Sequence, residues 1–185
     1  HYSPTNPVLA IIIILALFAL KTLSVFFYSD ILFTTTGLMF PLPVALFVNL
    51  LGAFVMTSEG YLMGSKLGSD LIENVAAKYP KMQPLLHLQD SKPFLFAFLL
   101  RMMKVINFDI GSMYMGASKM RFVPYSAASV LGMLPEVILY AVVGDGISRL
   151  QAGSIIGAGV IYAGITVAAF LILQYLVKNS ESTPQ

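Results

Sequence analysis

The chain has 185 residues, of which 57% are hydrophobic and only 11% are charged, and its net charge is +2. Ordinary soluble domains carry about one quarter charged residues, so this composition predicts an integral membrane protein rather than a soluble one. The small net charge gives no electrostatic footprint for nucleic acid. Because the chain has no cysteine, disulfide and thiolate sites are excluded.

Four apolar stretches are long enough to cross a bilayer as helices, which takes about 20 residues each. They are residues 7–28, 44–63, 123–143 and 154–177. A cleaved signal peptide is the alternative for the first stretch, but no basic segment precedes it. Lys21 falls near the far end of that stretch, where we expect its ammonium group to snorkel to the membrane surface. The predicted fold is therefore an all-α membrane domain with four spanning helices.

Two further apolar stretches, residues 29–43 and 93–116, carry groups that break helices or are costly in lipid. The first holds Asp30 and three consecutive threonines, and the second holds three charges within nine residues. Irregular backbone at membrane depth is tolerated only where protein or a wet cavity surrounds it. We therefore expect two re-entrant hairpins, with a surface loop as the alternative for the first. The expected hinge positions are Gly37, Pro41, Pro43, Gly116 and Pro124.

A polar segment, residues 69–92, separates the two halves, and its apolar residues recur at helical spacing. It predicts an amphipathic helix on the membrane surface. In the predicted topology most basic residues fall on one side, namely Lys66, Lys78, Lys81, Lys92, Lys119, Arg121 and Lys178. The positive-inside rule then places both termini in the cytoplasm, and the short chain favours a bacterial plasma (inner) membrane.

The spacing of acidic residues and glycines repeats between the two halves. Seven residues separate Asp30 from Gly37 and Asp109 from Gly116, and twelve separate Gly52 from Gly64 and Gly132 from Gly144. We interpret residues 29–68 and 93–149 as two units, each a broken segment followed by a spanning helix. The charge count puts their hairpins on opposite sides of the membrane. This predicts an inverted repeat, an architecture with which many transporters build a midplane site.

Arg101 and Lys104 lie three residues apart, on one face of a predicted helix, and such charged residues in an apolar segment suggest a site. A buried structural pair between Arg101 and Asp109 or Asp30 is the alternative. Four carboxylates in apolar segments are candidates for proton coupling, namely Asp30, Glu59, Asp109 and Glu136. For Glu59 and Glu136 a role at a helix end or in interhelical hydrogen bonding is the alternative. No metal cluster, cofactor motif or nucleophile–base set is evident, so we expect no enzyme.

Several segments resemble the DedA/SNARE-associated Golgi (VTT-domain) superfamily of membrane proteins. They are SDILFTTTG from Ser29, GYLMGSKLG from Gly60, LLRMMKVINFDIGSMYMG from Leu99 and ASVLGMLPEVILYAVVG from Ala128. In the third segment Arg101, Phe108 and Gly116 keep the family's places. Lys104 stands where the family has proline, and Asn107 where the bacterial branch has a second arginine. The Golgi-type branch is therefore the closer match.

The resemblance implies movement of lipids between leaflets, of polyprenyl-phosphate carriers in bacteria or phospholipids in eukaryotes, with Asp30 and Arg101 as functional residues and Lys104 as a local substitute. The partner would be an anionic lipid, with Arg101 and Lys104 as the expected ligands of its head group, and a possible homodimer is a further implication. Two other functions stay open. One is a proton- or cation-coupled exporter of a small solute, and the other is a membrane assembly factor that transports nothing.

Overall fold

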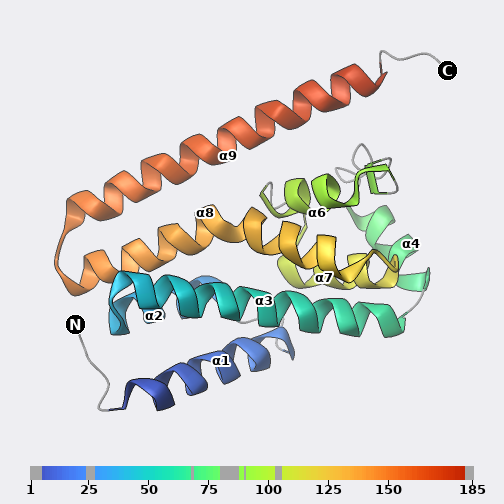
Figure 1. Ribbon diagram of the computed structural model, residues 1–185. Helices are drawn as coiled ribbons and strands as arrows, with labels where there is room; N and C mark the ends of the chain where they lie inside the picture. Colours follow the sequence, from blue (N-terminus) through green and yellow to red (C-terminus); the bar gives the residue numbers. More distant parts are fainter. Residues whose placement is uncertain are drawn as a thin grey trace. The chain divides into compact units, whose positions relative to one another are not determined.

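A computed structural model describes residues 6–23, 28–67, 69–79, 88–89, 91–102 and 106–181. The regular elements within these residues are α helices (Figure 1). They are α1 (Pro7–Leu23), α2 (Ser29–Met39), α3 (Leu42–Leu67), α4 (Ser69–Lys78), α6 (Pro93–Met102), α7 (Phe108–Ala117), α8 (Phe122–Ser148) and α9 (Ala152–Glu181). The all-α prediction is thus confirmed for the described part of the chain.

The chain divides into two compact units. The first unit comprises His1–Glu59 and Met133–Tyr162, and the second comprises Gly60–Gly132 and Ala163–Gln185. Because the boundaries fall inside α3, α8 and α9, each of these helices contributes one part to either unit.

Three of the described helices are long and apolar enough to cross a membrane: Leu42–Leu67, Phe122–Ser148 and Ala152–Ile172. They correspond to three of the four expected spans. The described part of α1 has 17 residues, and residues 24–27, which follow it, lie outside the described part of the chain. A fourth crossing by α1 stays a prediction.

The first broken segment is helical for longer than expected. Thr34, Thr35 and Thr36 lie inside α2, and their hydroxyl groups donate to the carbonyl oxygens four residues earlier at 2.7–2.8 Å. This back-bonding satisfies the hydroxyls without breaking the helix. The break falls at Phe40, whose backbone is extended (φ −120°, ψ 154°), and α3 begins two residues later.

The second broken segment consists of two short helices, α6 and α7, with residues 103–105 outside the described part of the chain. Asn107 caps α7, because its side-chain oxygen accepts a hydrogen bond from the Asp109 backbone N–H at 2.9 Å. After α7 a turn at residues 118–121 leads into α8. Re-entry of either segment into a membrane stays a prediction.

Glycines hold a short helix against a long helix in both units. In the first unit, a methyl group added to Gly37 of α2 would clash with the Ala141 carbonyl of α8, and one added to Gly144 would clash with the Thr34 carbonyl. In the second unit, Gly116 of α7 lies against the Tyr61 carbonyl of α3, and Gly64 lies against the Met113 carbonyl. We call these two contacts the glycine seams. Such close backbone approach is how helices associate where apolar burial gives little driving force.

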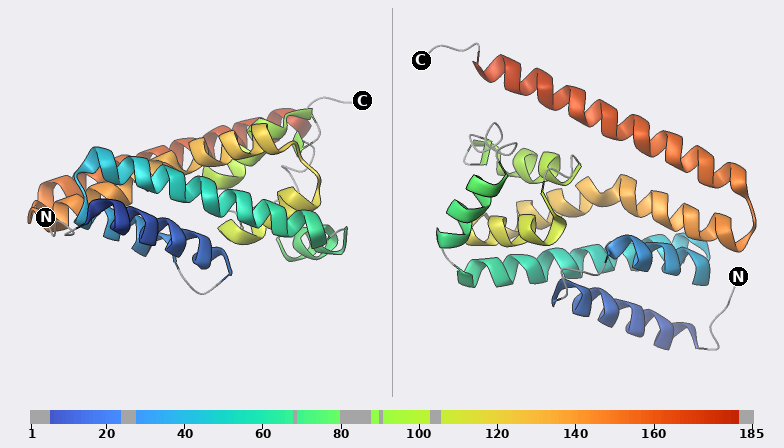
Figure 2. Two further views of the ribbon diagram at one scale, coloured as in Figure 1. Left: turned by 60° about the horizontal axis from the view of Figure 1, so that its bottom comes forward. Right: turned by 180° about the vertical axis from the view of Figure 1, so that it is seen from behind.

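The amphipathic segment forms α4, which lies beside α7 in the second unit (Figures 1 and 2). Val75 is buried there in a core with Tyr114 and Met115 of α7, and Ile72 packs against the same core. Its apolar face is therefore at least partly covered by protein. Its place on a membrane surface stays a prediction.

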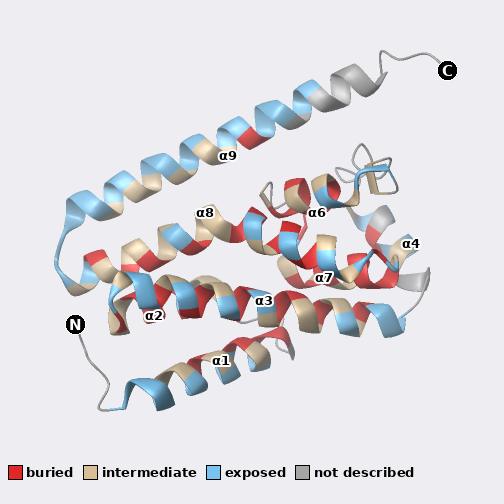
Figure 3. Ribbon diagram, viewed as in Figure 1, coloured by how far each residue is buried: buried red, intermediate tan, exposed pale blue. Residues whose placement is uncertain are grey.

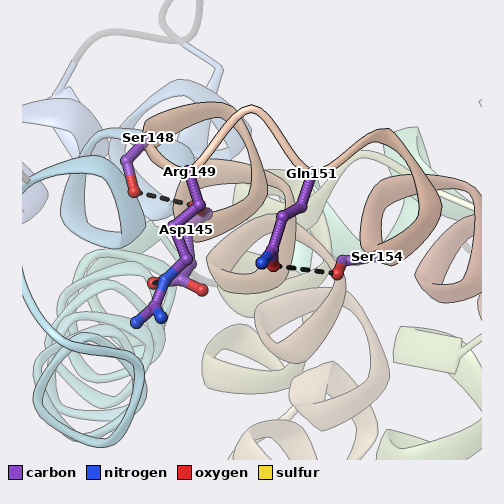
Figure 4. Close-up of polar contacts among 5 residues, drawn as sticks. All are labelled: Asp145, Ser148, Arg149, Gln151 and Ser154. Atoms are coloured by element: carbon purple, nitrogen blue, oxygen red, sulfur yellow. Dashed lines mark hydrogen bonds and ion pairs between the residues drawn. The ribbon is translucent and has the colours of Figure 1, made fainter.

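Polar contacts between nearby residues stabilise the C-terminal end of α8 and the turn that follows it (Figure 4). Arg149 donates from Nε to Asp145 Oδ1 at 3.0 Å, and the Ser148 hydroxyl donates to the Asp145 carbonyl at 2.7 Å. At the start of α9, the Ser154 hydroxyl lies 3.4 Å from Gln151 Oε1. Most described side chains of α9 are exposed (Figure 3), as suits a helix covered by lipid.

Candidate functional site

Arg101 of α6 is the centre of the polar contacts in the second unit. Its Nη1 donates to the Phe108 carbonyl at 2.8 Å, and its Nη2 donates to the hydroxyls of Ser112 at 2.6 Å and Tyr125 at 3.1 Å. Its Nε donates to the Ser129 hydroxyl at 3.3 Å. These four hydrogen bonds end on neutral oxygens of α7 and α8, so one guanidinium ties three helices together.

The surroundings of Arg101 are aromatic as well as polar. Its guanidinium carbon lies 4.2 Å from the centre of the Phe108 ring and 6.0 Å from that of Tyr125. Both are cation–π distances. Only 6% of Arg101 is exposed. The arrangement holds the guanidinium in one orientation, away from solvent, between aromatic rings and hydroxyl groups.

Asp109 is also buried in the second unit, at 2% exposure, in the first turn of α7. Glu59 of α3 belongs to the first unit. Its Oε2 atom is buried and has no hydrogen-bond partner within the described residues. Lys104, the second expected ligand, lies outside the described residues.

Asp30 and Tyr140 form the polar contact that joins α2 to α8 in the first unit. The Tyr140 hydroxyl donates to Asp30 Oδ2 at 2.8 Å. Glu136 lies four residues before Tyr140, on the same face of α8. Two of the four candidate carboxylates thus belong to one small region of the first unit.

Lys21 does not follow the snorkelling expectation. Only 5% of it is exposed, and the next residue, Thr22, is 1% exposed. Asn49 of α3 is fully buried in the same unit, with its amide nitrogen donating to the Phe33 carbonyl at 3.1 Å. A charged side chain near the end of an apolar helix can equally face a packed interior, and composition does not separate these cases.

The expected hinge residues fall into two groups. Pro41, Pro43 and Pro124 lie just before or within the first turns of α3 and α8, where a missing N–H costs no helical hydrogen bond. Gly37 and Gly116 lie inside α2 and α7 and form the glycine seams. A hinge role for any of the five stays a prediction.

The partners of Arg101 and Asp30 are the residues that sequence reasoning missed. Tyr125 and Tyr140 have the spacing of ordinary packing residues, and Ser112 and Ser129 are unremarkable in apolar helices. Their contacts connect different helices, so no spacing within one segment could have identified them. Among the described residues, no group of three His, Asp or Glu side chains could hold a metal ion.

Comparison with known families shows which family the chain belongs to. The family model of the VTT domain matches residues 25–146, a range that includes α2, α3, α4, α6 and α7 and nearly all of α8. No curated protein and no solved structure matches the chain. The expected resemblance is thus confirmed at the level of the family, and the preference for the Golgi-type branch stays a prediction. The chain is a membrane protein that belongs to the VTT-domain family, the domain of the DedA/SNARE-associated Golgi proteins.

Proposed function

We propose that this protein moves an anionic lipid, such as a phospholipid or a polyprenyl phosphate, between the leaflets of its membrane. The observation that carries the proposal is the buried Arg101 at the junction of α6, α7 and α8. A cation in hydrocarbon costs between about 3 and 17 kcal/mol. A guanidinium fork also matches the oxygens of a phosphate group better than any other side chain does.

Binding at Arg101 would require α7 to move. Its Nη2 atom is held by the hydroxyls of Ser112 and Tyr125, and a phosphate oxygen would take their place. Hydrogen bonds to a charged acceptor are stronger than those to a hydroxyl, so the exchange is favourable once the head group arrives. The non-helical residue Asn107 precedes α7, and the turn at residues 118–121 follows it. These are the two places where the backbone could bend to let α7 move.

The glycine seams support the proposed inverted repeat. In each unit a short helix from one half of the sequence packs, glycine against backbone, on the final turns of a spanning helix from the other half. Opposed repeats with discontinuous helices suit alternating access to a midplane site. The same proposal includes Lys104 as a second ligand, homodimerisation and a bacterial plasma membrane. It also includes four candidate proton carriers, namely Asp30, Glu59, Asp109 and Glu136.

A proton- or cation-coupled exporter is the second candidate, favoured by the Asp30–Tyr140 contact and by the partnerless Glu59 Oε2 atom within the described residues. Carboxylates in apolar segments suit the coordination of a transported ion.

The test is exchange of reporter phospholipid and polyprenyl phosphate between the leaflets of proteoliposomes. We expect exchange with the wild-type protein and a loss of about tenfold or more in Arg101→Gln, which corresponds to one charge-assisted hydrogen bond. Arg149→Gln is the matched control, because Arg149 is exposed and pairs only locally with Asp145.

Size-exclusion profiles and helical circular dichroism show whether each variant is folded. If folded wild-type protein gives no more exchange than empty vesicles, lipid movement is refuted, and flux of ions and solutes then separates an exporter from an assembly factor. Equal exchange by Arg101→Gln and wild type would leave Arg101 a structural role only.

A further inference from the structure

Three basic side chains lie exposed at one end of the second unit. They are Lys66 in the last turn of α3, and Lys119 and Arg121 in the turn between α7 and α8. The end of α3 and this turn lie side by side (Figures 1 and 2), because the Tyr61 hydroxyl of α3 donates to the Met120 carbonyl of the turn. We call Lys66, Lys119 and Arg121 the basic patch.

The charges of the basic patch are not neutralised by the surrounding protein. None of the three side chains has a hydrogen bond or ion pair with the residues that the structure describes. By contrast, Arg149 at the end of α8 pairs with Asp145 at 3.0 Å. The neighbouring helix α4 has two charged side chains among those described, Glu73 and Lys78, and both are exposed. They carry opposite charges, so α4 leaves the patch positive.

The backbone at Lys119 favours glycine. The φ angle of Lys119 is 53°, and its N–H donates to the Gly116 carbonyl at 3.0 Å. The next N–H, that of Met120, donates to the Met115 carbonyl at 3.3 Å. These two hydrogen bonds form a Schellman motif, in which glycine is the usual residue at the position of Lys119 because it has no Cβ. A lysine there costs stability, and what it adds is an exposed positive charge.

Exposed apolar side chains accompany the cations. Leu67 follows Lys66 and is 54% exposed, and Val123 lies two residues after Arg121 and is 74% exposed. A nucleic acid or another soluble polyanion would leave these side chains in water. The boundary between lipid head groups and acyl chains accommodates basic and apolar side chains together. The combination therefore fits a membrane surface better than a soluble partner.

We propose that the basic patch binds the head groups of anionic lipids in the leaflet at this end of the second unit. In the predicted topology this is the cytoplasmic leaflet, where anionic lipids attract basic segments next to the membrane. Charge, exposure and the backbone of Lys119 carry this inference, so it stands apart from the proposed movement of lipid. Because Arg101 belongs to the same unit, the patch would also concentrate anionic lipid near the candidate site.

The test measures thermal stabilisation of the purified protein in neutral detergent by short-chain phosphatidylglycerol. A ligand that binds the folded state raises the melting temperature by mass action, so a titration gives an apparent Kd. We expect Lys66→Gln, Lys119→Gly and Arg121→Gln each to weaken this Kd about fivefold, the effect of one cation near an anionic surface. Binding should also weaken as salt is added, because exposed charges are screened far more than the buried Arg101.

Lys119→Gly separates binding from folding. Without lipid, this variant should melt at the wild-type temperature or above it, because glycine adopts a positive φ without strain, and yet it should bind phosphatidylglycerol more weakly. Leu150→Gly is the matched control. Leu150 has a φ of 55° in the turn after α8 and carries no charge, so its replacement should leave the Kd unchanged.

Short-chain phosphatidylcholine and glycerophosphoglycerol form the other arms. Stabilisation by phosphatidylglycerol that exceeds both, and that weakens in Lys119→Gly, supports the patch. Equal stabilisation by glycerophosphoglycerol, which has the same head group without acyl chains, would overturn a lipid surface as the occupant. An unchanged Kd in Lys119→Gly, or in the variant with all three cations replaced, overturns the patch, whatever the vesicles show. If wild-type protein moves no lipid but these variants still bind phosphatidylglycerol more weakly, lipid movement fails and the patch stands.

Discussion

Arg101 and Asp30 show two ways of keeping a charged group within apolar helices. Arg101 is surrounded by hydroxyl and carbonyl oxygens from α7 and α8. Asp30 sits in the first turn of α2, where the helix dipole favours negative charge, and accepts a hydrogen bond from Tyr140. In both cases the partner comes from a distant part of the sequence. Such contacts are specific to the folded state, so their loss should affect function and stability together.

Replacing Asp30 by Asn tests proton coupling. If Asp30 or Glu59 loads and releases a proton during transport, exchange by Asp30→Asn or Glu59→Gln should lose its pH dependence, because an amide does not titrate in this range. Leaflet exchange measured across pH 5–9 gives the answer. Asp145→Asn is the control, since Asp145 pairs with Arg149 at the exposed end of α8. A pH profile unchanged in both Asp30 and Glu59 variants would remove these carboxylates from the coupling role.

The sequence predicted which charged residues lie in apolar segments but not what surrounds them. Arg101 stands out because a guanidinium is rare among apolar residues. Ser112, Tyr125 and Ser129 do not stand out, because serine and tyrosine are common in membrane helices and their role depends on packing between helices. Lys21 was misplaced for the same reason: an apolar helix end is compatible with both a surface and a buried position.

At the level of the elements, the glycine seams explain why two short helices stay in place. Each short helix has only 10 or 11 residues and would be marginal in isolation. Backbone-to-backbone contact at Gly37 and Gly144, and at Gly116 and Gly64, leaves no room for a side chain. These positions should therefore be far less tolerant of substitution than other glycines.

Alanine substitutions measure this intolerance. We expect Gly64→Ala and Gly144→Ala to lower the melting temperature, at a cost of about 1–3 kcal/mol each, because the added methyl group meets rigid backbone. Gly159→Ala is the matched control, since no heavy atom from elsewhere in the described structure lies within 4 Å of its added methyl group. Alanine in an open helical position should be neutral or slightly stabilising. Heating followed by size-exclusion chromatography compares the three, and equal behaviour would contradict the role of the seams.

Element boundaries were predicted less well than element identity. The amphipathic pattern of residues 69–78 and the long apolar runs gave helices as expected. The threonine run was expected to interrupt its helix, but hydroxyl back-bonding keeps it helical, and the interruption falls at Phe40. Propensities measured in water undervalue this, because in apolar surroundings a hydroxyl has few alternatives to the nearby carbonyl.

At the level of the whole molecule, the side of the membrane on which the N-terminus lies depends on whether α1 crosses the membrane. The sequence alone predicts four crossings and two cytoplasmic termini. If α1 instead returns to its own side, the crossings number three, and only the C-terminus is cytoplasmic.

Reporter fusions at either end decide between these topologies. We expect a C-terminal reporter to be cytoplasmic in both cases, because the basic residues after α3 and before α8 lie on that side. We expect an N-terminal reporter to be cytoplasmic as well, as four crossings require. An external N-terminal reporter would contradict the four-span prediction and would show that α1 returns to its own side of the membrane.

The glycine seams also bear on the response of the protein to ionic strength. The close contacts that define them join glycines to uncharged backbone atoms, so dissolved ions have nothing there to screen. The ion pair between Asp145 and Arg149 is partly exposed and contributes little once salt reduces the Debye length to a few ångströms. Concentrated salt should therefore leave the short helices on their long neighbours. An anionic head group bound at the buried Arg101 should also resist it, because buried charge pairs are screened far less than exposed ones.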